Sequence, residues 1–207
     1  MPEAPTFELE ATFPGLIAGI DEAGRGTWAG PVVASAVILN RNCTPAGLRD
    51  SKTLTAKRRD ELAASLWKCA RIGVGIATVD EIDQLNILKA TYLAMQRAAA
   101  TLPVRPKTVL VDGKYAPRFP CQAYPVIKGD TKSLSIAAAS IIAKTTRDRM
   151  MLELSRHWPG YGWDANKGYG ARAHQDGLNA QGITPHHRRT FAPIRSLLGA
   201  NEARLAV

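Results

Sequence analysis

Short apolar runs separated by turns dominate the pattern of hydrophobic and polar positions along the chain. Five of these runs have the length and the content of β-branched residues that are typical of strands. The third run shows the clearest alternation, with Ile72, Val74 and Ile76 on one face. The five expected strands are Leu16–Ile20, Val32–Leu39, Arg71–Thr78, Thr108–Val111 and Gln122–Ile127.

Apolar positions at helical spacing predict the remaining elements. A first helix follows Asp50-Ser51-Lys52, with Thr53 or Thr55 as its cap. Asp80 caps a second helix that continues to about Thr101, a long third helix runs from about Ser133 to Arg156, and a short fourth one ends near Gln181. Strands interleaved with helices predict an α/β fold with a mixed sheet.

The chain has the length of one domain, and no linker or internal repeat divides its 207 residues. Residues 1–14 are rich in Pro and Glu, and we expect them to be frayed and flexible. The tail from Gly199 is rich in Ala, which predicts a loose or weakly helical segment. We therefore expect a single domain over residues 1–207.

Charge is distributed unevenly along the chain. The whole protein has 27 Lys and Arg against 18 Asp and Glu, a formal net charge of +9. Residues 1–22 hold five of the acids and no Lys or Arg, so the remaining residues carry +14. A body this basic favours nucleic acid as the partner, because Lys and Arg neutralise phosphates and release counterions. Solubility alone is the alternative explanation.

Cysteine content and hydropathy indicate the cellular compartment in which we expect the protein. Cys43, Cys69 and Cys121 are far apart, and no Cys-x-x-Cys pair occurs. This pattern favours neither a zinc site nor a disulfide framework. The sequence shows no signal-peptide pattern at its beginning and no apolar run near the ~18 residues of a membrane span. We expect a cytoplasmic protein without a membrane partner, and a monomer.

Four carboxylates follow the ends of predicted strands directly or within two or three residues. They are Asp21, Glu22, Asp112 and Asp130. Strand ends at one edge of an α/β sheet converge, so these acids are expected to share a site. Carboxylate oxygens without nearby histidines suit Mg²⁺ or Mn²⁺. Two such ions can activate water and stabilise the leaving oxygen in phosphodiester hydrolysis. Adjacent strand residues point to opposite faces of a sheet. Asp21 and Glu22 can therefore face one metal ion only if the chain bends there, and we expect such a bend.

A glycine-rich segment follows the first two acids. Gly24-Arg25-Gly26-Thr27-Trp28-Ala29 matches the dinucleotide-binding pattern G-x-G-x-x-A, but Pro31 and a strand follow it where that fold needs a helix. We therefore expect a loop between two antiparallel strands. Gly24 and Gly26 allow a ligand to approach the backbone closely, and Arg25 supplies a fixed positive charge.

Several other polar residues have open interpretations. Lys52 lies where it can reach a phosphate, and Lys144 is spaced to pair with Asp148. Tyr169, between two glycines in a basic segment, either stacks on a sugar or base or packs inside the protein. The histidines are expected at the surface: His157 and His174 have no evident partner, and His186 and His187 suit a polar surface or phosphate contacts.

With these motifs in order, the chain resembles bacterial ribonuclease HII, the type 2 ribonuclease H, from about Ile17 to Ser196. Its first part carries Gly19–Gly26, Ala29–Ala34, Asp50-Ser51-Lys52 and Asn86-Ile87-Leu88. Its second part carries Val111-Asp112-Gly113, Lys128-Gly129-Asp130, Ser135–Lys144 with Arg147-Asp148, Lys167–Gly170, and His187-Arg188-Arg189 with Phe191.

This resemblance implies a ribonuclease H-like fold with a central mixed five-stranded sheet, flanking helices, and a C-terminal helical extension, about residues 157–207, packed on the same domain. It implies endonucleolytic cleavage of the RNA strand of RNA–DNA hybrids and of single ribonucleotides in duplex DNA. The products would carry a 3′-hydroxyl and a 5′-phosphate, and the biological roles would be ribonucleotide removal from DNA and RNA primer removal.

The resemblance also assigns residues. Asp21, Glu22, Asp112 and Asp130 take the catalytic and metal-binding roles, with Mn²⁺ or Mg²⁺ as the cofactor. Gly24, Arg25 and Gly26 match the loop that reads the ribonucleotide 2′-hydroxyl, and Tyr169 matches the aromatic that packs on the next deoxyribose. The further residues expected to bind substrate are Ser51, Lys52, Lys128, Lys144, Lys167 and Arg188.

The chain departs from the family pattern at two places near the loop. Thr27-Trp28 stands where the family usually has Pro-Leu, and Ala171 where it commonly has Thr. Two other functions remain open on the residues alone. One is a binding module without catalysis, which leaves the acids unexplained. The other is a metal-dependent nuclease that cuts DNA.

Overall fold

The computed structural model describes residues 4–205 and contains one five-stranded sheet. The strands are β1 (Ile17–Ala23), β2 (Val32–Ile38), β3 (Arg71–Ala77), β4 (Thr108–Asp112) and β5 (Gln122–Val126). They lie in the order β3-β2-β1-β4-β5. β2 pairs antiparallel with β1 and β3, whereas β4 pairs parallel with β1 and β5. The predicted mixed sheet is confirmed.

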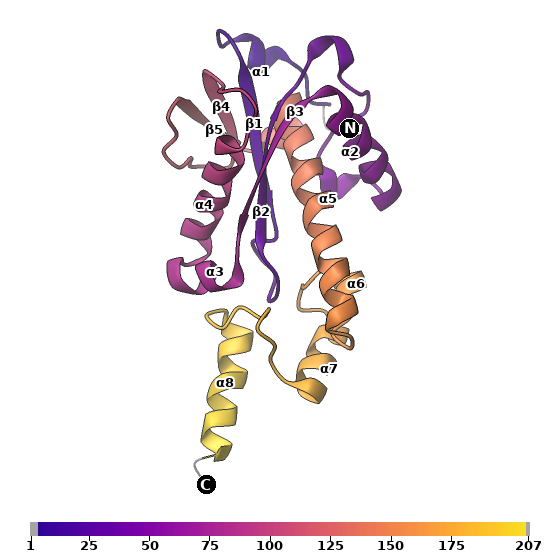
Figure 1. Cartoon of the computed structure of the whole chain (residues 1–207), viewed down its shortest axis with the longest axis vertical. Helices are drawn as coiled ribbons and strands as arrows, with labels where there is room; N and C mark the ends of the chain where they lie inside the picture. Colours follow the sequence, from indigo (N-terminus) through magenta and orange to yellow (C-terminus); the bar gives the residue numbers. More distant parts are fainter. Residues whose placement is uncertain (1–3, 206–207) are drawn as a thin grey trace.

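Helix α5 (Leu134–His157) runs along one face of the sheet, and α2 (Ala56–Cys69) packs beside it (Figure 1). The first turns of α5 are small residues, as the sequence predicted, and they lie against β1. A Cβ atom added at Gly19 would lie only 2.1 Å from the backbone carbonyl carbon of Ser135. The absence of a side chain at Gly19 therefore lets the helix backbone touch the strand.

Helices α3 (Val79–Leu85) and α4 (Ile87–Ala100) cover the opposite face of the sheet (Figure 1). The sequence predicted one helix from Asp80 to Thr101, and this prediction is wrong at Asn86. That residue has a φ of 73°, and its side-chain oxygen accepts from the amides of Leu88 and Lys89, so it ends one helix and caps the next. Thr78, not Asp80, caps α3, in a capping box with Glu81.

Short helices and turns link these layers. They are α1 (Glu8–Ala11), η1 (Arg41–Cys43), η2 (Ser51–Thr53) and η3 (Gly129–Thr131) before α5, and α6 (Trp163–Asn166), α7 (Arg172–Gln181) and α8 (Ala192–Leu205) after it. Thr55 caps α2, one of the two predicted caps. Within residues 4–205, no helix combines the length and hydropathy that a membrane crossing requires.

The C-terminal segment forms its own apolar cluster with the end of α5. Trp163 of α6, Leu178 of α7 and Ile194 of α8 are buried there with Met151 of α5 and Ala29 of the β1–β2 loop. In Figure 1 these helices lie at the end of the molecule toward which the β1–β2 loop points. The segment therefore holds that loop as well as the helix.

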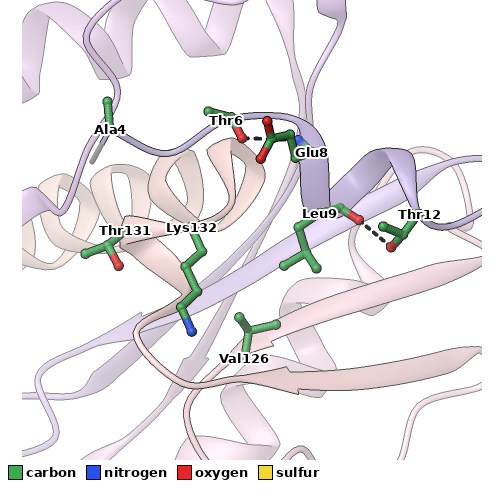
Figure 2. A pocket seen from close by; sticks show the side chains of 8 residues that line it. All are labelled: Ala4, Thr6, Glu8, Leu9, Thr12, Val126, Thr131 and Lys132. Atoms are coloured by element: carbon green, nitrogen blue, oxygen red, sulfur yellow. Dashed lines mark hydrogen bonds between the residues drawn. The ribbon is translucent and has the colours of Figure 1, made fainter. Parts of the chain in front are cut away.

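The N-terminal segment is packed rather than frayed, which corrects the prediction for residues 4–14; residues 1–3 lie outside the described part. The backbone of Thr6 bridges to that of Ser133. Glu10 is 5% exposed, and its carboxylate accepts from the Ser133 hydroxyl at 2.7 Å and the Ser135 amide at 2.9 Å. Figure 2 shows Thr6 and Leu9 of this segment across from Thr131 and Lys132. These residues line a cavity with a volume of about 580 Å³.

Glu10 should contribute measurably to stability through this contact. In the Glu10→Ala variant, the Ser133 hydroxyl and the Ser135 amide lose their acceptor at the buried start of α5. We expect the free energy of unfolding in urea to fall by about 1–3 kcal/mol. Glu8→Ala, an exposed change on the same helix, is the matched control and should stay within about 0.5 kcal/mol. Equal values for the two variants would contradict this role.

Candidate active site

Three chain segments bring the four predicted carboxylates to one edge of the sheet. Asp21 and Glu22 lie within β1, Asp112 ends the neighbouring parallel strand β4, and Asp130 lies in η3 just before α5. The amide of Gly129 donates to Asp112 Oδ1 at 2.7 Å, which ties η3 to the end of β4. The sequence predicted the shared edge correctly.

The acids are close enough to affect one another electrostatically. Burial raises the pKa of Asp21 well above its usual range, and the charges of Glu22, Asp112 and Asp130 raise it further. The pKa of Asp130 is raised to about 6 by burial and by the neighbouring carboxylates of Asp50 and Asp112. Such a group is costly to ionise without a compensating cation.

The expected bend between Asp21 and Glu22 is absent. β1 continues in regular pairing through Ala23, with Asp21 opposite Ser35 and Glu22 opposite Ala34. The amide of Glu22 donates to Asp21 Oδ1 at 2.6 Å. Within residues 4–205, no three acidic, histidine or cysteine side chains are already gathered where one metal ion could sit. The four carboxylates thus lie at one edge of the sheet and affect one another electrostatically, but they do not form a preformed metal-coordination site.

The donor set nevertheless fits a hard divalent cation. Arg25 Nη1 donates to Glu22 Oε1 at 3.2 Å, whereas Glu22 Oε2 is buried and has no hydrogen-bond partner among the described residues. Burial raises the pKa of Glu22, and Asp112 raises it further against the opposing effect of Arg25. A buried carboxylate oxygen without a donor, beside further carboxylates, is a position that a cation would stabilise.

A cavity of about 350 Å³ lies beside these acids and gathers most of the residues predicted to bind substrate. Those that line it are Gly24, Arg25, Gly26, Ser51, Lys52, Lys144 and Tyr169, together with Glu22. The pKa of Lys52 is raised by the charges of Asp50, Asp21, Asp130 and Asp112 in spite of burial, so this ammonium lies within the field of the carboxylates. Lys144 pairs with Asp148 at 2.7 Å, as predicted.

Tyr169 presents its ring to solvent at the cavity, with 48% of the residue exposed. Its backbone is fixed: the amide donates to Asn166 at 3.0 Å, and the carbonyl lies 2.9 Å from His174 Nδ1. The alternative of a packed aromatic is therefore wrong. A rigid backbone under an exposed ring suits stacking on a sugar or base.

Three predicted substrate residues lie outside the cavity. Lys128 is exposed in the η3 turn, with a φ of 54°. The Lys167 ammonium donates to the carbonyl of Asp164, and its own carbonyl accepts from Arg147. Arg188 is fully buried and donates only to the backbone carbonyls of the loop, so a direct substrate contact is wrong for this residue.

Sequence reasoning missed three groups around the site. Asp50 acts on the pKa of Asp130, and its position before Ser51-Lys52 was the only signal. Arg147 lines the cavity from beneath. His174 and His187 were expected at the surface but are buried, with their Nε2 atoms 3.0 Å apart. Their partners come from different segments, so spacing along the chain gives no sign of them.

The raised pKa of Asp130 predicts how pH changes stability without metal. An acid whose pKa is higher in the folded state stabilises the fold below about pH 4 and loses this contribution as pH rises through about 6. In EDTA, Asp130→Asn should therefore become more stable than the parent protein by about 1–2 kcal/mol at pH 7, allowing for solvent screening. The difference should vanish near pH 4. Urea unfolding of both proteins at the two pH values measures it.

Comparison with solved structures identifies the fold. A ribonuclease H2 from Pyrococcus horikoshii OT3 is 26% identical, with a TM-score of 0.74 over 91% of this chain and 99% of that one. Bst-RNase HIII in complex with Mn²⁺ is 22% identical, with a TM-score of 0.74 over 91% of this chain and 70% of that one, and it supports the fold alone. The fold and the acidic sheet edge define an enzyme of the ribonuclease H-like class.

Sequence comparison gives the family. The model of the family described as Ribonuclease HII matches residues 18–194. A ribonuclease HII of Rhizorhabdus wittichii is 56% identical over 190 residues, which are 92% of this chain and 94% of that protein. The chain belongs to the ribonuclease HII family. It is an endoribonuclease that acts on RNA–DNA hybrids, and the alternative of a binding module without catalysis is wrong.

Proposed function

We propose that this enzyme cleaves the RNA strand of RNA–DNA hybrids and also single ribonucleotides embedded in duplex DNA, leaving a 3′-hydroxyl and a 5′-phosphate. The observation that carries the proposal is the group of four carboxylates at one sheet edge, where the pKa values of Asp21, Glu22 and Asp130 are raised, beside a basic cavity with an exposed tyrosine. The acids explain hydrolysis of a phosphodiester. The cavity explains how a sugar-phosphate chain is held against them.

The cofactor in this proposal is Mn²⁺ or Mg²⁺, held by Asp21, Glu22, Asp112 and Asp130. All four offer oxygen, and the unpartnered Glu22 Oε2 supports a cation at this point. Two bound divalent ions supply the activation of water and the stabilisation of the leaving oxygen. The Mn²⁺ held by Bst-RNase HIII is consistent with this choice.

The protein's own side chains bind and orient the substrate. Gly24, Arg25 and Gly26 present backbone and a cation at the cavity wall, where the ribonucleotide 2′-hydroxyl would be read. Tyr169 would pack on the following deoxyribose. Lys52, which lies within the field of the acids, would hold the phosphate next to the scissile bond.

Other polar and basic side chains at the site would bind the strand on either side of the ribonucleotide. Ser51 and Lys144 line the same cavity, and Lys128 is exposed next to Asp130, so each can face a phosphate. Lys167 contributes through the turn that it shares with Tyr169. In this proposal Arg188 has no direct substrate contact.

The biological setting follows from the chemistry. An enzyme that cuts at ribonucleotides in DNA would serve ribonucleotide removal and RNA primer removal. We propose that it works as a monomer in the cytoplasm, which agrees with three free thiols at Cys43, Cys69 and Cys121. We also propose one domain over residues 1–207, because the apolar cluster of the C-terminal helices includes residues of α5 and of the β1–β2 loop.

Three duplexes test the function. One carries a single ribonucleotide in DNA, the second is an RNA–DNA hybrid, and the third is all DNA, each incubated with Mn²⁺, with Mg²⁺ or with EDTA. We expect cleavage of the first two with either ion, none in EDTA and none of the all-DNA duplex. Mapping of the ends should give a 3′-hydroxyl and a 5′-phosphate.

The same assay separates the alternatives. Cutting of the all-DNA duplex would contradict the reading of the 2′-hydroxyl by the cavity and would favour a metal-dependent DNA nuclease. Cutting of the hybrid but not of the single ribonucleotide would contradict only the finer substrate proposal. Activity in EDTA would contradict the metal-dependent mechanism.

A further inference from the structure

Two segments at the cavity wall are joined directly: the glycine loop (residues 24–30) and the tyrosine turn (residues 167–170). The amide of Trp28 donates to the carbonyl of Gly168 at 2.8 Å. A Cβ added at Gly170 would lie 2.1 Å from the ring of Trp28, and one at Gly168 would lie 2.5 Å from the carbonyl oxygen of Ala29. The two segments therefore touch through positions that have no side chain.

Arg147 connects the same two segments from beneath. Its Nε donates to the carbonyl of Pro31 at 2.9 Å, and its Nη2 donates to the Thr27 hydroxyl at 2.8 Å and the carbonyl of Ala29 at 3.0 Å. Its Nη1 donates to the carbonyl of Lys167 at 2.9 Å. One rigid guanidinium thus fixes the glycine loop and the tyrosine turn together.

Arg188 supports the glycine loop from a second direction. It donates to the carbonyls of Gly24, Arg25 and Gly30 at 2.5–3.0 Å. Among residues 4–205, no carboxylate forms an ion pair with Arg147 or Arg188. Burial lowers the pKa of Arg147 to about 10 and that of Arg188 to about 9, so both remain cations at neutral pH. Arg147 lines the cavity and Arg188 lies behind the glycine loop, and the hydrogen-bond partners of both are mainly backbone carbonyls.

Thr27 is the part of this network that lies inside the glycine loop itself. It is fully buried. Its hydroxyl accepts from Arg147 and lies 3.1 Å from the carbonyls of Gly24 and Ala29, to either of which it donates. The threonine therefore fixes the loop by hydrogen bonds to the arginine and to the loop's own backbone.

The tyrosine turn is held from its other side by neutral histidines. Trp163 Nε1 donates to His174 Nε2 at 3.1 Å, so the proton of His174 is on Nδ1 and is donated to the carbonyl of Tyr169. The Thr184 amide donates to His187 Nδ1, which leaves the His187 proton on Nε2, facing His174. Burial lowers the pKa of both histidines. The carbonyl of Tyr169 therefore has a fixed donor.

We propose that Arg147, with the Thr27 hydroxyl, is a positioning residue for ribonucleotide selectivity: it sets the glycine loop and the ring of Tyr169 at a fixed separation across the cavity. Neither group touches the reacting atoms. The inference rests on the proposed reading of the 2′-hydroxyl by the loop. It assigns selectivity to the rigid connection between the glycine loop and the ring of Tyr169. Loosening this connection therefore reduces the discrimination between a duplex with a ribonucleotide and an all-DNA duplex, while the carboxylates stay intact.

Binding without turnover tests this proposal. The parent protein, Thr27→Val, Thr27→Ser and Arg147→Lys are compared by fluorescence anisotropy in Ca²⁺, with a DNA duplex carrying one ribonucleotide and with its all-DNA counterpart. The measured quantity is the ratio of the two dissociation constants. We expect this ratio to fall about fivefold in Thr27→Val and further in Arg147→Lys, and to stay within about twofold in Thr27→Ser, which keeps the hydroxyl. Arg149→Lys, an exposed change on α5, is the matched control.

The outcomes are distinguishable. An unchanged ratio in Thr27→Val, in a parent protein that discriminates, overturns the inference and leaves the proposed function intact. A parent ratio near one contradicts the proposed reading of the 2′-hydroxyl itself. An equal loss of affinity for both duplexes, with lower thermal stability, indicates a merely structural role and also overturns the inference. If Arg147→Lys does not fold, the Thr27→Val and Thr27→Ser pair decides.

Discussion

In the Asp21→Asn variant, we expect cleavage of a duplex with a single ribonucleotide to fall at least about 1000-fold, equivalent to about 4 kcal/mol of transition-state stabilisation. Asp21 is 7% exposed and interacts with the charges of Glu22, Asp112 and Asp130, so an amide there removes the most central of the negative charges. Single-turnover kinetics in Mn²⁺ and in Mg²⁺ measure the loss.

The same variant should be more stable than the parent protein in EDTA. Replacing a buried carboxylate whose pKa is raised removes a repulsion that is present at neutral pH. We expect the metal-free melting temperature to rise by about 2–5 °C. Asp60→Asn, the same change at an exposed position on α2, is the control for both measurements. An active Asp21→Asn variant, or one less stable in EDTA, would contradict the placement of Asp21 in the carboxylate group.

Arg188→Met is expected to give the largest loss of stability. The variant removes the guanidinium donors from the carbonyls of Gly24, Arg25 and Gly30 in a buried region. Each unsatisfied buried acceptor costs about 1–3 kcal/mol, and the partly relieved burial of the charge offsets some of this. We expect a loss of about 3–5 kcal/mol and a melting temperature lower by about 6–20 °C.

Arg189→Met is the matched control for this prediction, because the neighbouring side chain is exposed. Only its backbone amide is engaged, by Asp83 at 2.9 Å, and the substitution keeps that contact. We expect a change within about 0.5 kcal/mol. Similar melting temperatures for the two variants would show that Arg188 does not support the glycine loop.

The sequence predicted the parts of this molecule that depend on local pattern. The five strands, the packing of small residues in α5 and the delivery of Asp112 to a strand end all follow from periodicities of two and 3.6 residues. The four acids could be selected because each follows an apolar run. Their proximity then required only that strand ends meet at one edge of the sheet.

Features that depend on distant partners escaped prediction. Nothing local marks Glu10 as buried, because its donors Ser133 and Ser135 lie more than 120 residues away. His174 and Arg188 belong to residue types that usually lie at the surface. Their hydrogen-bond acceptors are backbone carbonyls that only the folded chain brings near them. The helix break at Asn86 uses a backbone with a φ of 73°, which the apolar spacing of the segment does not reveal.

Gly19 links the interior of the protein to the spacing of its acids. α5 lies directly against β1 at this residue, two positions before Asp21, and η3 with Asp130 immediately precedes α5. The distance between the carboxylates of Asp21 and Asp130 therefore depends on the absence of a Cβ atom at Gly19. A single methyl group at this position would push the helix outward, so a residue of the core, and not only the acids themselves, determines how closely Asp21 and Asp130 approach each other.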